Sequence, residues 1–188
     1  LPTRAGLIFG AAMVVLLIGS INYGLQLGFL LTFLVTSVAV VGMYHTHRNL
    51  AHLRLRGHRA EAVFAGDVVA FELLVTNPTP EPRHALNFSF VLPTRRKAGG
   101  LFRRERPLPG SWIDVPAKGT RPVSLSLPTR RRGRRACPRV RIETRFPFGL
   151  WQAWAYFTPP LSAIVYPRPE EDAPPLPLAL GGSLYGAG

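Results

Sequence analysis

The chain has 188 residues, a formal net charge of +13 and one cysteine, Cys137. A single cysteine excludes an intramolecular disulfide framework and a zinc site built on cysteines. Of the 23 basic residues only Lys97 and Lys118 are lysines, and arginine-rich surfaces are typical of contact with phosphate or carboxylate groups. Lipid headgroups and nucleic acid are therefore the candidate anions, although a GC-rich genome produces the same arginine excess without functional meaning.

Two uncharged apolar runs, residues 5–21 and 25–44, stand near the start of the chain. Each is close to the length of about 20 apolar helical residues that a bilayer core requires. Between them the sequence Asn22-Tyr23-Gly24 is polar and typical of a turn. Residues 1–44 are therefore predicted to form a transmembrane helical hairpin. A secretory signal peptide followed by an anchor is the alternative, and the immediate second run disfavours it.

The arginines predict the orientation of this hairpin. Arg4 precedes the first run, four arginines follow the second within residues 48–59, and the linking residues 22–28 contain no lysine or arginine. The positive-inside rule then places both termini in the cytoplasm.

The two helices are expected to contact each other through small and hydroxyl side chains. The candidates are Gly6 and Gly10 on the first helix and Thr32 and Thr36 on the second. The alternative is that glycine and threonine are simply common in membrane helices.

Residues 45–58 are predicted to be a basic juxtamembrane segment that continues the second helix for two or three turns. Leu50, Leu53 and Leu55 are expected to lie on the membrane surface. Lipid headgroups are the expected contacts of three arginines in and beside this segment, namely Arg54, Arg56 and Arg59. The segment also holds four histidines, but they lack nearby cysteines or preceding carboxylates, so no metal site is predicted.

Residues 59–167 are rich in short segments of alternating or β-branched character, which predicts an all-β, immunoglobulin-like antiparallel sandwich of seven to nine strands. Residues 60–64 and 68–77 are expected to pair as a hairpin around a turn at residues 65–67. Further strands are expected at residues 86–92, 111–115, 122–127, 139–145, 150–157 and 163–166. Residues 168–188 are rich in proline and glycine and are expected to be a linker to a further, C-terminal domain.

The sequence contains no recognisable catalytic pattern. It has no G-x-S-x-G elbow, phosphate-binding P-loop, dinucleotide glycine fingerprint or H-E-x-x-H helix, and its acidic residues are scattered singly through the β region. We therefore expect neither an enzyme nor a cofactor.

Two arginine-rich stretches, residues 95–106 and 130–135, are candidates for anion binding. The second is expected at the tip of a β-hairpin and contains Arg130, Arg131, Arg132, Arg134 and Arg135. One interpretation is contact with lipid headgroups or, less favoured for a domain held at a membrane, nucleic acid. The alternative is that solvated charges protect a sheet edge from aggregation.

The densest aromatic stretch runs from residue 144 to residue 154. Its members Phe146, Pro147, Phe148, Gly149 and Leu150, together with Trp154, predict a structural corner between two strands with buried rings. Gly149 is expected to adopt a backbone conformation that a Cβ would penalise.

The chain also resembles a known family through motifs spread along its length. They are residues 46–50 (THRNL), 64–66 (FAG), 132–133 (RG), 145–150 (RFPFGL) with Trp154, and 165–169 (VYPRP). Together they are similar to the N-terminal half of bacterial membrane proteins in domain-of-unknown-function family fifty-eight.

That resemblance implies a non-enzymatic protein of the bacterial inner membrane. The hairpin would anchor a cytoplasmic sandwich and present a downstream domain, related to von Willebrand factor A domains, to a MoxR-type AAA+ ATPase. The alternative function is an anion-binding module that contacts lipid headgroups or nucleic acid through the arginine-rich loops. The resemblance supplies no catalytic residue.

Overall fold

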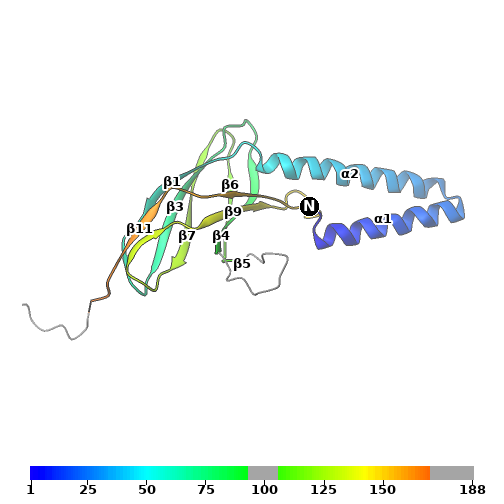
Figure 1. Cartoon of the computed structure of the whole chain (residues 1–188). Coiled ribbons are helices and arrows are strands. Elements are labelled where there is room, and N and C mark those ends of the chain that lie inside the picture. Colours follow the sequence, from blue (N-terminus) through cyan, green and yellow to red (C-terminus); the bar gives the residue numbers. More distant parts are fainter. Residues whose placement is uncertain (93–105, 170–188) are drawn as a thin grey trace, which may run out of the picture.

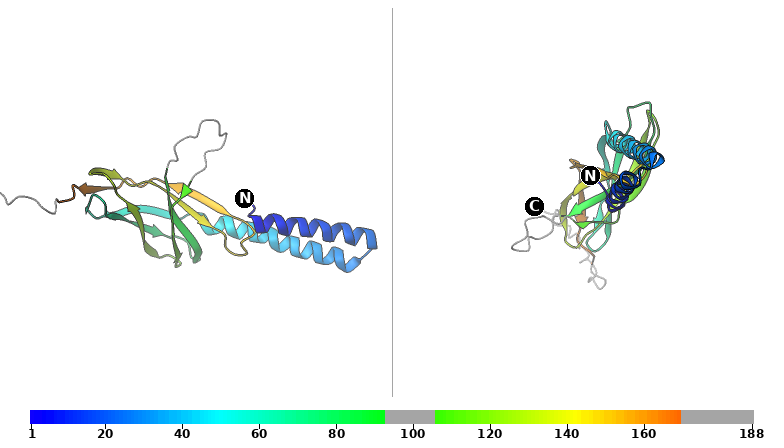
Figure 2. Two further views of the ribbon diagram at one scale, coloured as in Figure 1. Left: turned by 90° about the horizontal axis from the view of Figure 1, so that it is seen from below. Right: turned by 90° about the vertical axis from the view of Figure 1, so that its right-hand side faces the viewer.

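The computed structural model describes residues 1–92 and 106–169 of the chain. A helical hairpin extends from one end of a β-sandwich, and the described chain leaves the sandwich at its opposite end (Figure 1 and Figure 2). The two predicted parts are therefore present and are joined end to end.

The hairpin consists of α1 (Arg4–Tyr23) and α2 (Gln26–Leu50). Thr3 caps α1, because its hydroxyl accepts a hydrogen bond of 3.0 Å from the Gly6 amide. Both helices are long and apolar enough to cross a bilayer. The rest of the chain covers little of them, and side chains such as Ile8 and Val15 are 72% and 70% exposed.

The predicted glycine contact between the helices is wrong. A Cβ on Gly10 would meet nothing within 4 Å, and a Cβ on Gly6 would meet the backbone of Leu150 rather than α2. The Thr32 hydroxyl bonds the Gly28 carbonyl of its own helix at 2.8 Å. Close packing instead lies near the turn of the hairpin, where the buried Ser20 contacts Gly28.

The boundary predicted for the juxtamembrane segment is also corrected. Helix α2 continues to Leu50, and the first strand of the sandwich, β1 (Arg54–Ala60), already begins at Arg54. Leu50, Leu53 and Leu55 pack against the hydrophobic core instead of lying on a membrane surface. The segment thus joins helix to sandwich through a short, packed connection.

Eleven strands form three sheets within the residues that the structure describes. The first sheet has the order β1, β3 (Val68–Thr76), β7 (Thr120–Pro128). In the second, β4 (Arg83–Leu92) lies between β9 (Arg139–Thr144) on one side and β5 (Arg106–Pro107) and β6 (Ser111–Val115) on the other, with β10 (Ala153–Phe157) beside β9. A small third sheet contains β2 (Val63–Phe64), β11 (Ser162–Tyr166) and β8 (Gly133–Ala136).

Alternating side chains of the first two sheets form the core, as the sequence pattern predicts. On β3, every second residue from Val69 to Val75 is fully buried, and Val140 and Ile142 on β9 are buried as well. The rings of Phe71 and Phe90 meet edge to face across the core, with centroids 5.8 Å apart.

Two pairing predictions are wrong. Residues 60–64 and 68–77 do not form the predicted hairpin, because only Ala60, the last residue of β1, pairs with β3, opposite Phe71. The short β2 pairs in parallel with β11 instead. Residues 130–135 do not form the tip of a hairpin either, because β8 pairs with β11 and not with β7. Both errors come from long-range partners that a local turn signal does not reveal.

Cys137 is expected to be unreactive in the folded protein. It is buried within the core cluster, and this burial raises the pKa of its thiol to about 12. At pH 8 the reactive thiolate is then about a thousandfold scarcer than for a thiol with the usual pKa near 9. Maleimide labelling of the folded chain should be very slow and should become fast on unfolding. Rapid labelling under native conditions would contradict the buried position.

Candidate functional site

The most elaborate polar arrangement in the structure is the junction between the hairpin and the sandwich. It brings together the C-terminal end of α2, the start of β4, the end of β9 and residues 145–152, which we call the junction loop. The N-terminal end of α1 contacts the same loop. In this junction individual side chains form hydrogen bonds that connect the helices to the sandwich.

Asn49, buried in the last turn of α2, is the central residue of this junction. Its amide nitrogen donates to the His84 carbonyl at 2.7 Å and to the Thr144 hydroxyl at 2.8 Å, while its oxygen accepts from the His84 amide at 3.1 Å. The side chain thus pairs with both backbone groups of His84 as a neighbouring strand would. It joins α2 to β4 and β9 at once.

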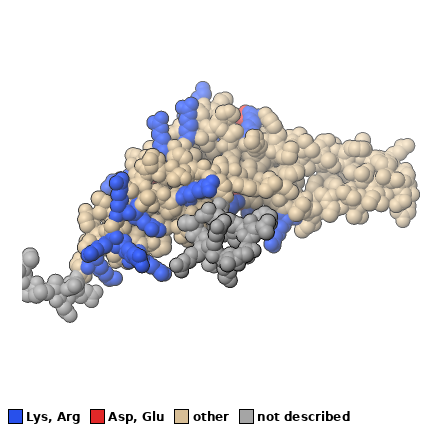
Figure 3. Space-filling model, viewed as in Figure 1, with Lys and Arg blue, Asp and Glu red and all other residues tan. Residues whose placement is uncertain are grey.

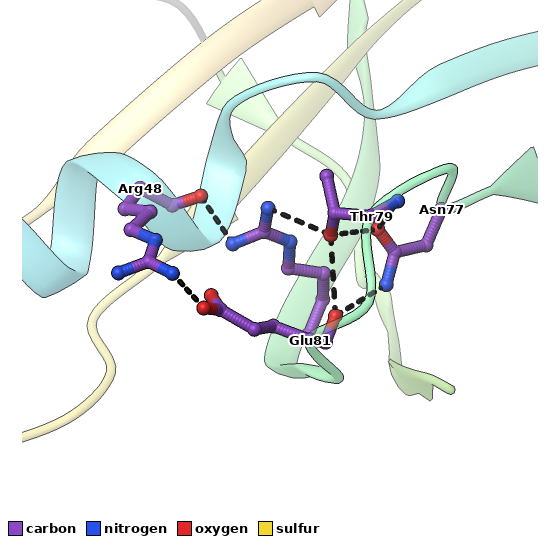
Figure 4. Close-up of polar contacts among 5 residues, drawn as sticks. Arg48, Asn77, Thr79 and Glu81 are labelled. Carbon is purple, nitrogen blue, oxygen red and sulfur yellow. Dashed lines mark hydrogen bonds and ion pairs between the residues drawn. The ribbon is translucent and has the colours of Figure 1, made fainter. Parts of the chain in front are cut away.

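A second network surrounds Arg83 (Figure 4). Its guanidinium donates to the Arg48 carbonyl at the end of α2 and to the Thr79 hydroxyl, the latter at 3.0 Å. The Arg48 side chain forms an ion pair with Glu81, and the Glu81 carbonyl accepts from the Asn77 side chain at 2.7 Å. Burial first, and then the neighbouring Arg48 charge, lowers the pKa of Arg83. A buried cation that bonds the carbonyl end of a helix also complements the helix dipole.

The junction loop contacts both helices. Its Phe146 carbonyl accepts from the Thr46 hydroxyl at 2.8 Å, and the Trp151 indole N–H donates to the Ala39 carbonyl of α2 at 2.9 Å. On the α1 side, the Leu150 carbonyl accepts from the Thr3 amide at 2.9 Å and its neighbour Gly149 from the Thr3 hydroxyl at 2.6 Å. The sandwich is therefore tied to the start of one helix and the end of the other.

The prediction that the rings of the loop are buried is wrong. Phe146 is 37% and Phe148 is 57% exposed, because the loop extends beyond the sheets and lies against the helices rather than over the sandwich core. Pro147, Leu150 and Trp154 are half-buried. The backbone prediction for Gly149 is confirmed, with φ of +70°.

Gly149→Val is expected to destabilise the junction by about 1–3 kcal/mol, because a β-branched residue is strained at this positive φ. Gly149→Asn is the matched control, since asparagine tolerates the left-handed region far better. Thermal unfolding in detergent compares the two. Equal melting temperatures for the two variants would contradict the strained turn.

The arginines predicted to bind anions occupy two separate places. Arg54, Arg56 and Arg59 are exposed along β1, which starts at the junction, and Arg59 pairs with Glu61 at 3.3 Å. The second set, at residues 130–135, lies at the opposite end of the sandwich. It follows Thr129, which bonds the Asp67 carbonyl just before β3 begins, and it includes the start of β8, which pairs with the last strand, β11. That set is also exposed and comprises Arg130, Arg131, Arg132, Arg134 and Arg135.

On the face drawn in Figure 3, lysine and arginine side chains lie over the sandwich and at the base of the hairpin, whose remaining surface carries none. The stretch at residues 95–106 falls almost wholly outside the described residues. Within the described ranges, no three His, Cys, Asp or Glu side chains are grouped so that they could hold a metal ion.

No role for Arg83 or Thr3 was predicted from the sequence, and Asn49 entered only as part of the motif at residues 46–50. A signal for Asn49 existed in the sequence, because Gly42, Thr46 and Asn49 recur every three or four positions and so share one helix face, which the structure shows to be buried. A row of small and polar residues at the end of an apolar helix indicates that this face packs against another part of the protein. Its partner, 35 residues away at His84, was not readable from the pattern.

No family model matches the chain, and no curated protein matches it. Among solved structures, one similar chain is a beta-glucosidase from Listeria innocua in complex with glucose, with 10% sequence identity and a TM-score of 0.34. The alignment covers 62% of this chain and only 16% of the beta-glucosidase chain. A similarity of this degree carries no argument about activity.

Proposed function

We propose that the chain is a non-enzymatic anchor and presentation module of the bacterial inner membrane. Its hairpin spans the bilayer with both ends in the cytoplasm, and its sandwich stands on the cytoplasmic end of the helices. The observation that carries this proposal is the junction, where Asn49, Arg83 and Thr3 fix the sandwich to both helices. A flexible tether would need none of these contacts.

The direction of the chain supports presentation away from the membrane. The junction lies at one end of the sandwich, and β11, the last strand, leads to the opposite end (Figure 2). A strand as long as the nine-residue β3 spans about 30 Å. The last described strand therefore ends on the side of the sandwich that faces away from the hairpin, about one strand length from the junction.

The resemblance to domain-of-unknown-function family fifty-eight suggests what is presented. A domain related to von Willebrand factor A domains would follow the sandwich, and a MoxR-type AAA+ ATPase would bind it. Pull-down from solubilised membranes, using the protein with and without the region after Gly188, tests this partner. Recovery of the ATPase only with the longer protein is the expected result. Recovery of no ATPase with either form would contradict the proposal.

A second candidate function, anion binding, is favoured by the arginines at the far end of the sandwich. Among the described residues, Arg130, Arg131, Arg132, Arg134 and Arg135 are exposed and none forms an ion pair with a carboxylate. Salt titration of binding to anionic vesicles and to nucleic acid tests it. Replacing these arginines by glutamine should abolish binding if this second function is correct.

A further inference from the structure

We infer that the junction loop is itself a membrane-contacting element, with Phe146 and Phe148 inserted among the acyl chains of the cytoplasmic leaflet. This inference rests on the proposed function, because it requires the hairpin to span the bilayer. It adds a lipid-binding surface of the sandwich to the anchorage by the helices.

The height of the loop along the helices is the first argument. The Trp151 indole bonds the Ala39 carbonyl, and a Cβ on Gly42 would lie 2.8 Å from the Phe148 ring. At about 1.5 Å per residue, Ala39 and Gly42 lie about 20 and 24 Å along α2 from Gln26, its first residue. A hydrocarbon core is about 30 Å thick, so a bilayer that begins at the turn of the hairpin includes both positions. The Phe148 ring beside Gly42 then lies near the cytoplasmic edge of that core, and Phe146, whose carbonyl bonds Thr46 one turn further along α2, lies at this edge.

The surface around these rings has the chemistry of a lipid contact. A groove of about 560 Å³ beside the rings is lined mainly by apolar side chains, including Leu34, Val38 and Val41 of α2 and Phe146, Pro147 and Phe148 of the loop. The three α2 residues are themselves exposed and belong to the outer surface of the hairpin. The groove is thus continuous with the surface that acyl chains cover in a spanning hairpin. An acyl chain is the occupant that fits it.

Several polar groups of the loop backbone are bonded within the protein. Pro147 has no N–H, the Gly149 amide bonds the Arg145 carbonyl at 2.8 Å, and the Phe146 amide bonds the Thr144 hydroxyl at 3.3 Å. The carbonyls of Phe146, Gly149 and Leu150 accept from the helices as described above. Non-helical backbone is tolerated at membrane depth only when its polar groups find such partners.

Two arginines mark the level of the phosphate groups. Arg4 and Arg145 are exposed and line one hollow of about 530 Å³ together with Thr3 and Gly149. Arg145 also contacts Glu143, at 3.0 Å, and remains partly exposed. Aromatic rings next to exposed arginines are typical of a protein segment at the boundary between acyl chains and headgroups.

Spin labels on the full chain, reconstituted into vesicles of phosphatidylethanolamine and phosphatidylglycerol, test the inference. Phe148→Cys reports on the loop, and Ile164→Cys is the matched control, because the two side chains are 57% and 54% exposed and Ile164 lies on β11. Val15→Cys, 70% exposed on α1, reports on the hairpin. The label at Phe148 should be accessible to oxygen and several-fold less accessible to an aqueous nickel chelate than the label at Ile164.

Each other outcome has a definite meaning. A label at Phe148 as accessible to nickel as that at Ile164, with Val15 in lipid, would overturn the inference and leave the anchor proposal intact. A label at Phe148 shielded from both nickel and oxygen would mean that protein covers the loop, and would also overturn it. A label at Val15 exposed to nickel would overturn the anchor proposal and the inference together. If Phe148→Cys makes Cys137 reactive, the chain is unfolded and Phe146→Cys replaces it as the reporter.

Discussion

Replacing Asn49 with leucine is expected to lower the free energy of unfolding of the sandwich by about 2–4 kcal/mol. Leucine cannot form the three hydrogen bonds of the Asn49 side chain. The amide and carbonyl of His84 and the buried Thr144 hydroxyl therefore lose Asn49 as their partner. Leaving a buried polar group unsatisfied costs about 1–3 kcal/mol, which is more than the bond itself contributes. This is the largest single effect that we expect at the junction.

The labelling rate of Cys137 during denaturant unfolding measures this effect directly in the sandwich, because Cys137 belongs to its core. Asn22→Leu is the control for the change in polarity, since Asn22 is exposed near the turn of the hairpin. An unchanged unfolding midpoint for Asn49→Leu would mean that the junction does not stabilise the sandwich.

Gly6→Ala is expected to weaken the attachment of α1 to the sandwich, whereas Gly10→Ala should leave it intact. A Cβ on Gly6 would collide with the Leu150 carbonyl oxygen, and this oxygen is held in place by hydrogen bonds from Thr3. Because backbone cannot rotate away as a flexible side chain can, relief requires a shift of the helix or the loop, at a cost of about 1–3 kcal/mol.

Gly10 provides the matched comparison, because a Cβ there meets nothing within 4 Å. Both variants make the same chemical change in the same helix, so helix propensity and bilayer insertion affect them equally. Thermal unfolding in detergent should separate them, with a lower melting temperature for Gly6→Ala alone. An equal fall in melting temperature for both variants would instead support the glycine contact between the helices that the sequence predicts and the structure lacks.

The sequence predicted those parts of the fold that depend on local patterns. The alternation in residues 139–145 predicts a strand with Val140, Ile142 and Thr144 on one face, and all three are buried. The uncharged runs likewise predicted two helices. These features follow from periodicity alone, so they need no knowledge of the partner.

The junction could not be predicted in the same way, because its contacts join distant positions. Asn49 meets Thr144 across 95 residues, and Thr3 meets Gly149 across 146. The rings of Phe146 and Phe148 were expected inside the sandwich because large aromatic side chains usually fill a core. Here the loop that carries them leaves the sandwich and packs on α2, and only the three-dimensional arrangement shows which surface they face.

The central claim is that the hairpin spans a membrane with the sandwich on the cytoplasmic side, and labelling with an impermeant maleimide in spheroplasts tests it most directly. Two exposed positions report on the two sides, Tyr23→Cys in the turn of the hairpin and Ser126→Cys on β7. The parent chain, with only the buried Cys137, is the control. We predict that Tyr23→Cys is labelled in intact spheroplasts and Ser126→Cys only after lysis. Labelling of Ser126→Cys before lysis would contradict the account, because it would place the sandwich outside the cytoplasm.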